Sequence, residues 1–243
     1  MYKLIIIFTI YFTFFILLFF IIVYIKIIIV VINMKKCIII KKVNGKYKIP
    51  RFIRFKIRKN IDFKFEYEGK LYGKEIKSSN KEITQISLLI EALNIKDKKK
   101  RLEFVYDKSC DLLDDDFYGK NICEFKNNKC MHDRIHASSM DGCCRSNDNE
   151  KKCKYINNHI CSIRCLACKF HICYCVRQKG YKYKVNDILM LKYLYNWKQK
   201  IIAYNNFFMT KEETLKDVYR NSIIYWVLFN KTRNFIDNKT QQS

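Results

Sequence analysis

Cysteine and histidine gather in one stretch of this chain. The 243 residues include 12 Cys and 4 His, and all four His and all but two Cys lie between residues 121 and 180. Hydrophobic periodicity disappears over the same stretch, so neither an amphipathic helix nor a half-buried strand is indicated there. A segment that buries little apolar surface needs another source of folding energy, and bound metal supplies one. The stretch is therefore predicted to be irregular and held together by metal.

Thiolate and imidazole are the ligands that zinc and iron–sulfur centres take in proteins. One four-ligand site is predicted within residues 161–175 and another is centred on residues 123–136, with the pairing of ligands left open. The candidate metal ligands are Cys123, Cys130, His132, His136, Cys143, Cys144, Cys153, Cys161, Cys165, Cys168, Cys173 and Cys175. Zinc is the expected metal, because a closed site needs no further machinery. An iron–sulfur cluster is the alternative.

Other interpretations of these residue types stay open. In an oxidising compartment the same cysteines would form disulfides. Cys37 and Cys110, which lie outside the cluster, fit small buried hydrophobic residues. His159 and His171 fit surface or core positions as well as ligands, and the adjacent Cys143 and Cys144 could form a redox-active pair.

Three segments carry a resemblance to a known group of proteins. They are NICEFKNNKC at 121–130, GCCR at 142–145 and CLACKFHICYC at 165–175. Over about 123–180 the chain resembles uncharacterised cysteine-cluster proteins that are regarded as metal chelators, and the resemblance implies metal binding without a substrate. Cys161, Cys165 and Cys168 also share the spacing of the radical SAM cluster motif. That family is not favoured, because the chain beyond them is predicted to form helices rather than βα units.

The N-terminal segment is strongly apolar. Lys26 is the one charge between Leu4 and about Ile32, and residues 4–25 carry none. A helix of that uncharged length spans about 33 Å, close to the thickness of a bilayer core. Residues 1–33 are therefore predicted to form a single transmembrane anchor. The Lys and Arg excess that follows Met34 predicts a cytoplasmic location for the rest of the chain, and a start of translation at Met34 would make the whole protein cytoplasmic.

The predicted fold class is α+β. It comprises an N-terminal transmembrane helix, a small antiparallel β meander, helices flanking an irregular metal-stapled Cys-rich segment, and two C-terminal helices. The divisions are an anchor at 1–33, a basic β meander at 34–78, a helical segment at 79–120, a Cys/His-rich metal-binding segment at 121–180, C-terminal helices at 181–236 and a disordered tail at 237–243.

Local signals define the elements within these divisions. Asn44-Gly45 predicts a hairpin turn, and period-two alternation predicts strands over 53–57 and 61–67. Ser79 with Glu82, and Thr210 with Glu213, predict capping boxes that begin two helices. An apolar stripe from Leu102 to Phe117 predicts a longer helix, which the acidic run 114–116 would end as a solvated terminus.

The net charge of the chain limits the classes of partner that it favours. The net charge of +24 favours an anionic membrane surface, nucleic acid or acidic proteins as neighbours. No nucleophile elbow, phosphate-binding loop or HExxH motif occurs, so the sequence gives no positive sign of an enzyme. The favoured function is a membrane-anchored, cysteine-rich, zinc-binding protein with a structural or interaction role. The alternatives are an iron–sulfur or redox protein and a basic nucleic-acid-binding zinc protein.

Overall fold

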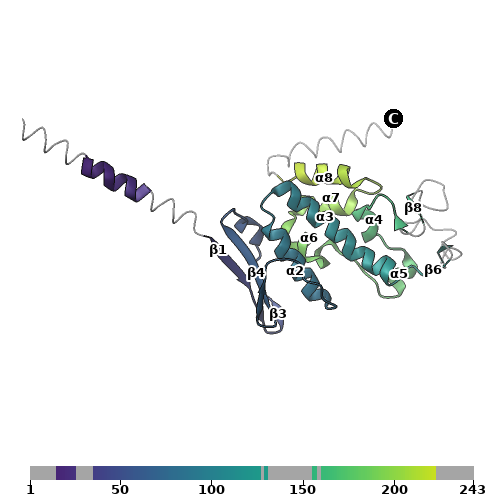
Figure 1. Cartoon of the computed structure of the whole chain (residues 1–243). Helices are drawn as coiled ribbons and strands as arrows, with labels where there is room; N and C mark the ends of the chain where they lie inside the picture. The colour runs from purple at the N-terminus through teal and green to yellow at the C-terminus, as the bar shows by residue number, and fades with distance from the viewer. Residues whose placement is uncertain (1–14, 26–34, 127–128, 131–154, 158–159, 223–243) are drawn as a thin grey trace, which may run out of the picture.

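The computed structural model describes residues 15–25, 35–126, 129–130, 155–157 and 160–222. Within these ranges the chain mixes helices with a small sheet, as the α+β prediction requires (Figure 1). The predicted tail at 237–243 lies outside the described residues.

The predicted transmembrane anchor is contradicted. Residues 15–25 are helical and apolar, and most of their side chains are exposed. Across the part of the chain that the structure describes, no helix is both long and apolar enough to cross a membrane. The prediction of a single-pass membrane protein anchored by residues 1–33 is therefore corrected.

The sheet has three strands in the order β1 (Lys36–Ile40), β4 (Ile61–Tyr67) and β5 (Lys70–Tyr72). β4 pairs antiparallel with β5, but β1 runs parallel to β4. The predicted all-antiparallel meander is therefore wrong in its first pairing. The connection between the parallel strands contains the hairpin β2 (Lys42–Val43) and β3 (Lys46–Tyr47), which turns at Asn44-Gly45 as predicted.

The strand predicted over 53–57 is a 3-10 turn, η1 (Ile53–Lys56). Its apolar residues do not share one face, because Ile53 is fully buried while Phe55 is 63% exposed. Period-two alternation was a poor guide here, since a parallel crossover has to turn the chain over this stretch.

Two long helices form the centre of the core. α2 (Lys81–Asn94) packs on β4 and on α3 (Lys98–Asp114). Asn80, not the predicted Ser79, caps α2, and its side chain accepts the amides of Glu82 and Ile83. The predicted apolar stripe of α3 is confirmed, because Leu102, Val105, Tyr106, Cys110 and Leu113 are all buried. A π-helical turn, η2 (Asp115–Gly119), continues α3.

The C-terminal part covers the other side of α3 with short helices (Figure 1). The single helix predicted after Asn186 is broken at Tyr195, because Asn196 and Gln199 form a capping box that starts a new helix. The predicted capping box of Thr210 and Glu213 is confirmed at the last one. In order these elements are α4 (Leu166–Phe170), α5 (Tyr174–Gln178), η3 (Val185–Asp187), α6 (Leu189–Leu194), α7 (Trp197–Asn205) and α8 (Lys211–Arg220).

The remaining strands are two-residue pairs beside the Cys-rich stretch. β6 (Phe125–Lys126) pairs with β7 (Lys129–Cys130), and β8 (Ile156–Asn157) pairs with β9 (Ile160–Cys161). Figure 1 draws β6 near α5 and β8 near α4.

Candidate functional site

The structure describes the side chains of five predicted metal ligands. Cys165, Cys168 and Cys173 are buried, and Cys123 and Cys175 are partly buried. Cys130 and Cys161 are placed in β7 and β9 by their main chain only. The other predicted ligands lie outside the described residues; they are His132, His136, Cys143, Cys144 and Cys153.

The five described ligands fall into two separate clusters. Cys165 and Cys168 pack with Ala167, against Phe207 and Phe208. The other three cysteines belong to a cluster built on Ile122, Ile172 and Val176. The separation follows from the local fold, because α4 ends at Phe170 and Cys173 caps the next helix, α5.

This separation contradicts the predicted metal-stapled fold and its metal-binding character. In the described ranges no three His, Cys, Asp or Glu side chains come together in a way that could hold a metal ion. The proximity of cysteines in sequence was misleading, because the break between α4 and α5 sends neighbouring thiols to different clusters. The identity of a cofactor, zinc or iron–sulfur, stays a prediction.

Cys165 and Cys168 lie in one buried cluster at the start of α4, where the Cys165 thiol donates to the Asn206 carbonyl at 3.2 Å. The hydrogen bond from the Cys168 thiol is the largest influence on Cys165, and it lowers the pKa of that thiol below the ordinary value of 9.0. Burial opposes the shift, but the backbone amides of Cys168, Phe208 and Met209 lower the pKa further. Hydrogen bonds to the charged form are what favours a thiolate in a buried site. Cys165 is therefore the residue of the described chain best prepared to carry a thiolate.

A rigid clamp holds this pair against the core. The Tyr106 hydroxyl donates to the Arg164 carbonyl and accepts the Leu166 amide, both at 3.2 Å. The Cys110 thiol donates to the same Arg164 carbonyl at 3.3 Å. Arg164 has a φ of 49°, in the left-handed region that a residue without glycine's freedom rarely adopts. Non-local contacts therefore fix the turn that presents Cys165.

Salt bridges add to the clamp. The Arg164 guanidinium pairs with Asp111 at 2.6 Å, and Lys169, which is 5% exposed, pairs with Asp114. Asp116 is also buried and pairs with Lys81 at 3.0 Å. The prediction that the acidic run 114–116 is a solvated helix end is therefore wrong, since two of its three carboxylates bind lysines that lie far away in sequence.

His171 lies one aromatic ring away from the thiol pair. Its imidazole meets the Phe207 ring edge-on at 4.4 Å and the Tyr204 ring at a tilt at 4.7 Å, measured between ring centres. Its Nε2 atom is buried, with no hydrogen-bond partner among the described residues. Burial, and then the charge of Arg177, lowers the pKa of His171. The ring is therefore neutral at neutral pH, and it extends the apolar wall around the thiols.

The two cysteines outside the cluster differ from each other. Cys110 is fully buried on the apolar stripe of α3, as predicted. Cys37 lies in strand β1 but is exposed, so its prediction as a buried residue is wrong. Cys37 and exposed Ile39 share the outer face of β1, whereas Ile38 and Ile40 on the other face are partly or fully buried.

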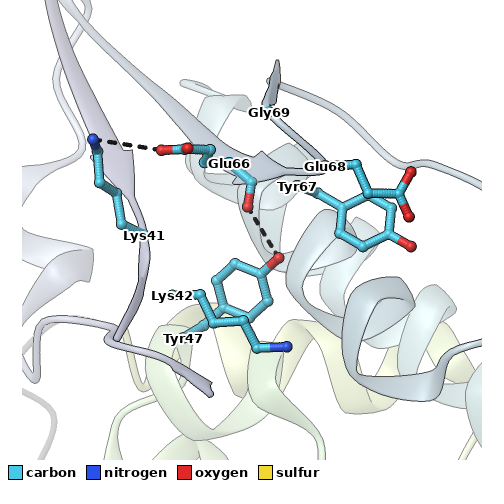
Figure 2. A pocket seen from close by; sticks show the side chains of 7 residues that line it. All are labelled: Lys41, Lys42, Tyr47, Glu66, Tyr67, Glu68 and Gly69. Carbon is cyan, nitrogen blue, oxygen red and sulfur yellow. Dashed lines mark hydrogen bonds and ion pairs between the residues drawn. The ribbon is translucent and has the colours of Figure 1, made fainter. Parts of the chain in front are cut away.

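A surface pocket of about 440 Å³ lies between the β2–β3 hairpin and the turn that joins β4 to β5 (Figure 2). Lys41 forms an ion pair with Glu66 at 3.4 Å, and the Tyr47 hydroxyl donates to the Glu66 carbonyl at 3.0 Å. Tyr67 and Glu68 line the opposite side. These groups satisfy one another in an open position, so the pocket is a weaker candidate site than the thiol pair.

Comparisons of the chain with protein-family models, with curated proteins and with solved structures found no match. The argument for function therefore rests on the site itself. Sequence reasoning included both cysteines but missed the amides of Phe208 and Met209. No local signal marks them, because they belong to a segment about forty residues further along the chain, in which the Asn206 carbonyl accepts a hydrogen bond from the Cys165 thiol at 3.2 Å.

Proposed function

We propose that this protein carries out thiol–disulfide exchange through the pair Cys165 and Cys168. The observation that carries the proposal is the set of hydrogen bonds that lowers the pKa of Cys165. Thiolates, not thiols, attack disulfides, and two cysteines separated by two residues at a helix start are a common arrangement for that chemistry. The proposal corresponds to the redox alternative that the sequence left open.

The exchange balances with a small disulfide as oxidant. The reduced pair holds one proton, with Cys165 as thiolate and Cys168 as thiol. The sulfurs of Cys165 and Cys168 form a bond with each other, and the sulfur–sulfur bond of the oxidant breaks. The oxidant leaves as one thiol, which takes the Cys168 proton, and one thiolate. Two electrons therefore pass from the pair to the oxidant.

Burial restricts what can reach the pair. Cys165 is fully buried and Cys168 is 6% exposed, so an oxidant meets the Cys168 sulfur first. The Cys165 thiolate takes the Cys168 proton as Cys168 attacks, and the first thiolate that leaves the oxidant takes this proton and departs as a thiol. The Cys165 thiolate then attacks the Cys168 sulfur of the mixed disulfide and displaces the second half of the oxidant as a thiolate. Because so little sulfur surface is open, small oxidants such as glutathione disulfide suit this site better than a bulky protein disulfide.

The direct test is to map disulfide formation in the full chain. Trypsin cuts after Arg164 and Lys169 and releases both cysteines on one five-residue peptide, whereas Cys110 leaves alone on peptide 109–120. Reduced protein is exposed to glutathione disulfide at neutral pH, quenched in acid, then unfolded, alkylated and digested. We expect peptide 165–169 to lose two hydrogen atoms and to stop taking up alkyl groups, while Cys110 is alkylated throughout. Dithiothreitol should reverse the change.

Variants separate exchange from unspecific oxidation. Cys165→Ser should stop at a mixed disulfide on Cys168, and Cys37→Ser, which removes an exposed single thiol, should leave the pair unaffected. If both cysteines of the pair stay open to alkylation at every oxidant concentration, the proposal is wrong. Stoichiometric zinc that protects both thiols until a chelator removes it would also overturn it, in favour of metal binding.

A further inference from the structure

A second pocket, of about 310 Å³, lies where η1, α3, α6 and α7 meet. Three cationic side chains line it: Arg54 from η1, and Lys98 and Arg101 from the first turn of α3. Phe55 and Leu102 supply apolar surface beside them. The cations come from segments that are far apart in sequence, so the fold alone brings them together.

The three cations have no carboxylate partner in the described part of the chain. Arg54 donates to the Tyr195 carbonyl at 3.1 Å, and Lys98 reaches the Ser222 carbonyl at 3.4 Å. Arg101 donates to the carbonyls of residues 95 and 96, at 2.5 and 3.3 Å. Elsewhere on the described surface Lys and Arg side chains commonly pair with acids, as Lys108 does with Glu75 at 2.8 Å. The pocket thus concentrates positive charge that main-chain carbonyls neutralise only in part.

The pKa values of two of these cations, Lys98 and Arg101, are lowered. Burial, and then the neighbouring charge of Arg101, lowers the pKa of Lys98. Burial also lowers the pKa of Arg101, against the opposing effect of Asp97, the nearest acid. Lys200 behind the pocket has a lowered pKa from burial and from the charge of Arg54. A site that gathers like charges stabilises an anion, because the bound anion relieves their repulsion.

Hydrogen bonds hold one wall of the pocket in place. The Asn196 amide group donates to the Asn221 carbonyl at 2.8 Å, and the Gln199 amide group donates to the Val218 carbonyl at 2.9 Å. These bonds fix the wall that faces the cations. The first turns of α3 and α7 both border the pocket, and helix N-termini add positive potential. Little reorganisation is therefore needed when an anion enters.

We propose that this pocket binds a small phosphorylated molecule through Arg54, Lys98 and Arg101. Guanidinium groups match the oxygens of a phosphate in pairs, and two of the three cations are arginines. The volume lies at the lower end of the range for ligand pockets, so a compact phosphate ester or diphosphate fits better than a dinucleotide. The apolar surface of Phe55 lies beside the cations, where the organic part of the ligand can pack.

Calorimetric titration of the full chain with pyrophosphate tests this site. We expect one-to-one binding that weakens as the salt concentration rises. Lys98→Gln and Arg54→Gln should each weaken binding roughly tenfold, the effect of losing one charge-assisted hydrogen bond. Arg51→Gln is the matched control, because Arg51 is an exposed neighbour of Arg54 that packs on the Phe52 ring and does not line the pocket. It should change affinity less than twofold, a change of about 0.4 kcal/mol or less.

Three outcomes would overturn the proposal. The first is no heat of binding with folded protein at low salt. The second is an equal loss in Arg51→Gln and Lys98→Gln, which would indicate unspecific attraction to a basic surface. The third is flotation with phosphatidylglycerol vesicles without any binding of pyrophosphate, which would assign the cations to a lipid surface. Lys98→Gln keeps the test valid if Arg54→Gln fails to fold, because the Lys98 side chain makes only a long hydrogen bond to the Ser222 carbonyl, at 3.4 Å, and a contact with the Tyr219 ring at 6.0 Å.

Discussion

Cys110 and Cys165 lie on either side of the same peptide group and behave in opposite ways. Both side chains are fully buried, and the Arg164 carbonyl accepts the Cys110 thiol immediately before Cys165 in the chain. Burial raises the pKa of Cys110 to about 12. The pKa of Cys165 is lowered, because the Cys168 thiol and three backbone amides donate toward its sulfur. Hydrogen-bond donors, and not exposure, therefore set the opposite directions of the pKa shifts at these two buried thiols.

Removal of the Cys168 thiol, which has the largest effect on Cys165, should reduce the pKa difference between Cys165 and Cys110 the most. Cys168→Ala deletes the hydrogen bond that contributes most to the lowered pKa of Cys165, so burial becomes the dominant influence and the pKa rises. Titration of the thiolate absorbance should show a step below the ordinary cysteine range in the parent protein and none there in the variant. Cys37→Ser should retain the step. An unchanged step in Cys168→Ala would mean that the backbone amides suffice.

The second largest effect is expected at Tyr106, whose hydroxyl holds the residues on either side of Cys165. Tyr106→Phe deletes a hydroxyl that donates to the Arg164 carbonyl and leaves the amide of buried Leu166 without its acceptor. An unsatisfied buried amide costs about 1–3 kcal/mol. Urea unfolding should show a loss of this size, and disulfide formation in peptide 165–169 should slow as the turn loosens. A loss below about 0.5 kcal/mol would show that water replaces the hydroxyl.

These effects involve contacts that the sequence could not have revealed. The apolar stripe of α3 and the Thr210 cap depend on spacing within one helix, and both were predicted. The parallel pairing of β1 with β4 and the break between α4 and α5 depend on tertiary packing, and both were missed. Ten clustered cysteines suggested one chemistry because they are close in sequence. The separation of the five cysteines with described side chains into two clusters, and the effect of the Phe208 and Met209 amides on Cys165, appear only when the chain is folded.

The dependence of stability on pH should have opposite signs at the two cysteines. The pKa of Cys165 is lower in the folded state than in the unfolded state, so its contribution is complete above pH 9.0 and is lost as the pH falls through the folded value. The pKa of Cys110 is raised, so its contribution is complete below pH 9.0 and is lost as the pH rises toward about 12.

Urea unfolding of Cys165→Ser and Cys110→Ser across about pH 6 to pH 10 measures both contributions. The difference between parent and Cys165→Ser should shrink toward acid, and the difference between parent and Cys110→Ser should shrink toward alkali, each by about 1.4 kcal/mol per pH unit at most. If the two stability differences change with pH in the same direction, the pKa values of the Cys165 and Cys110 thiols are not shifted in opposite directions.

The smallest effect is expected at the ion pair of Arg164 with Asp111. The two side chains are 42% and 50% exposed, and exposed pairs contribute about 1 kcal/mol or less. Asp111→Asn also leaves the Arg164 guanidinium its bond to the Asp107 carbonyl at 3.2 Å. Urea unfolding should therefore show a loss below about 1 kcal/mol, and the rate of disulfide formation in peptide 165–169 should not change. A severalfold change in that rate would mean that the charge of Arg164 influences the reaction of Cys165 with Cys168, and that the main-chain contacts of Arg164 are not sufficient.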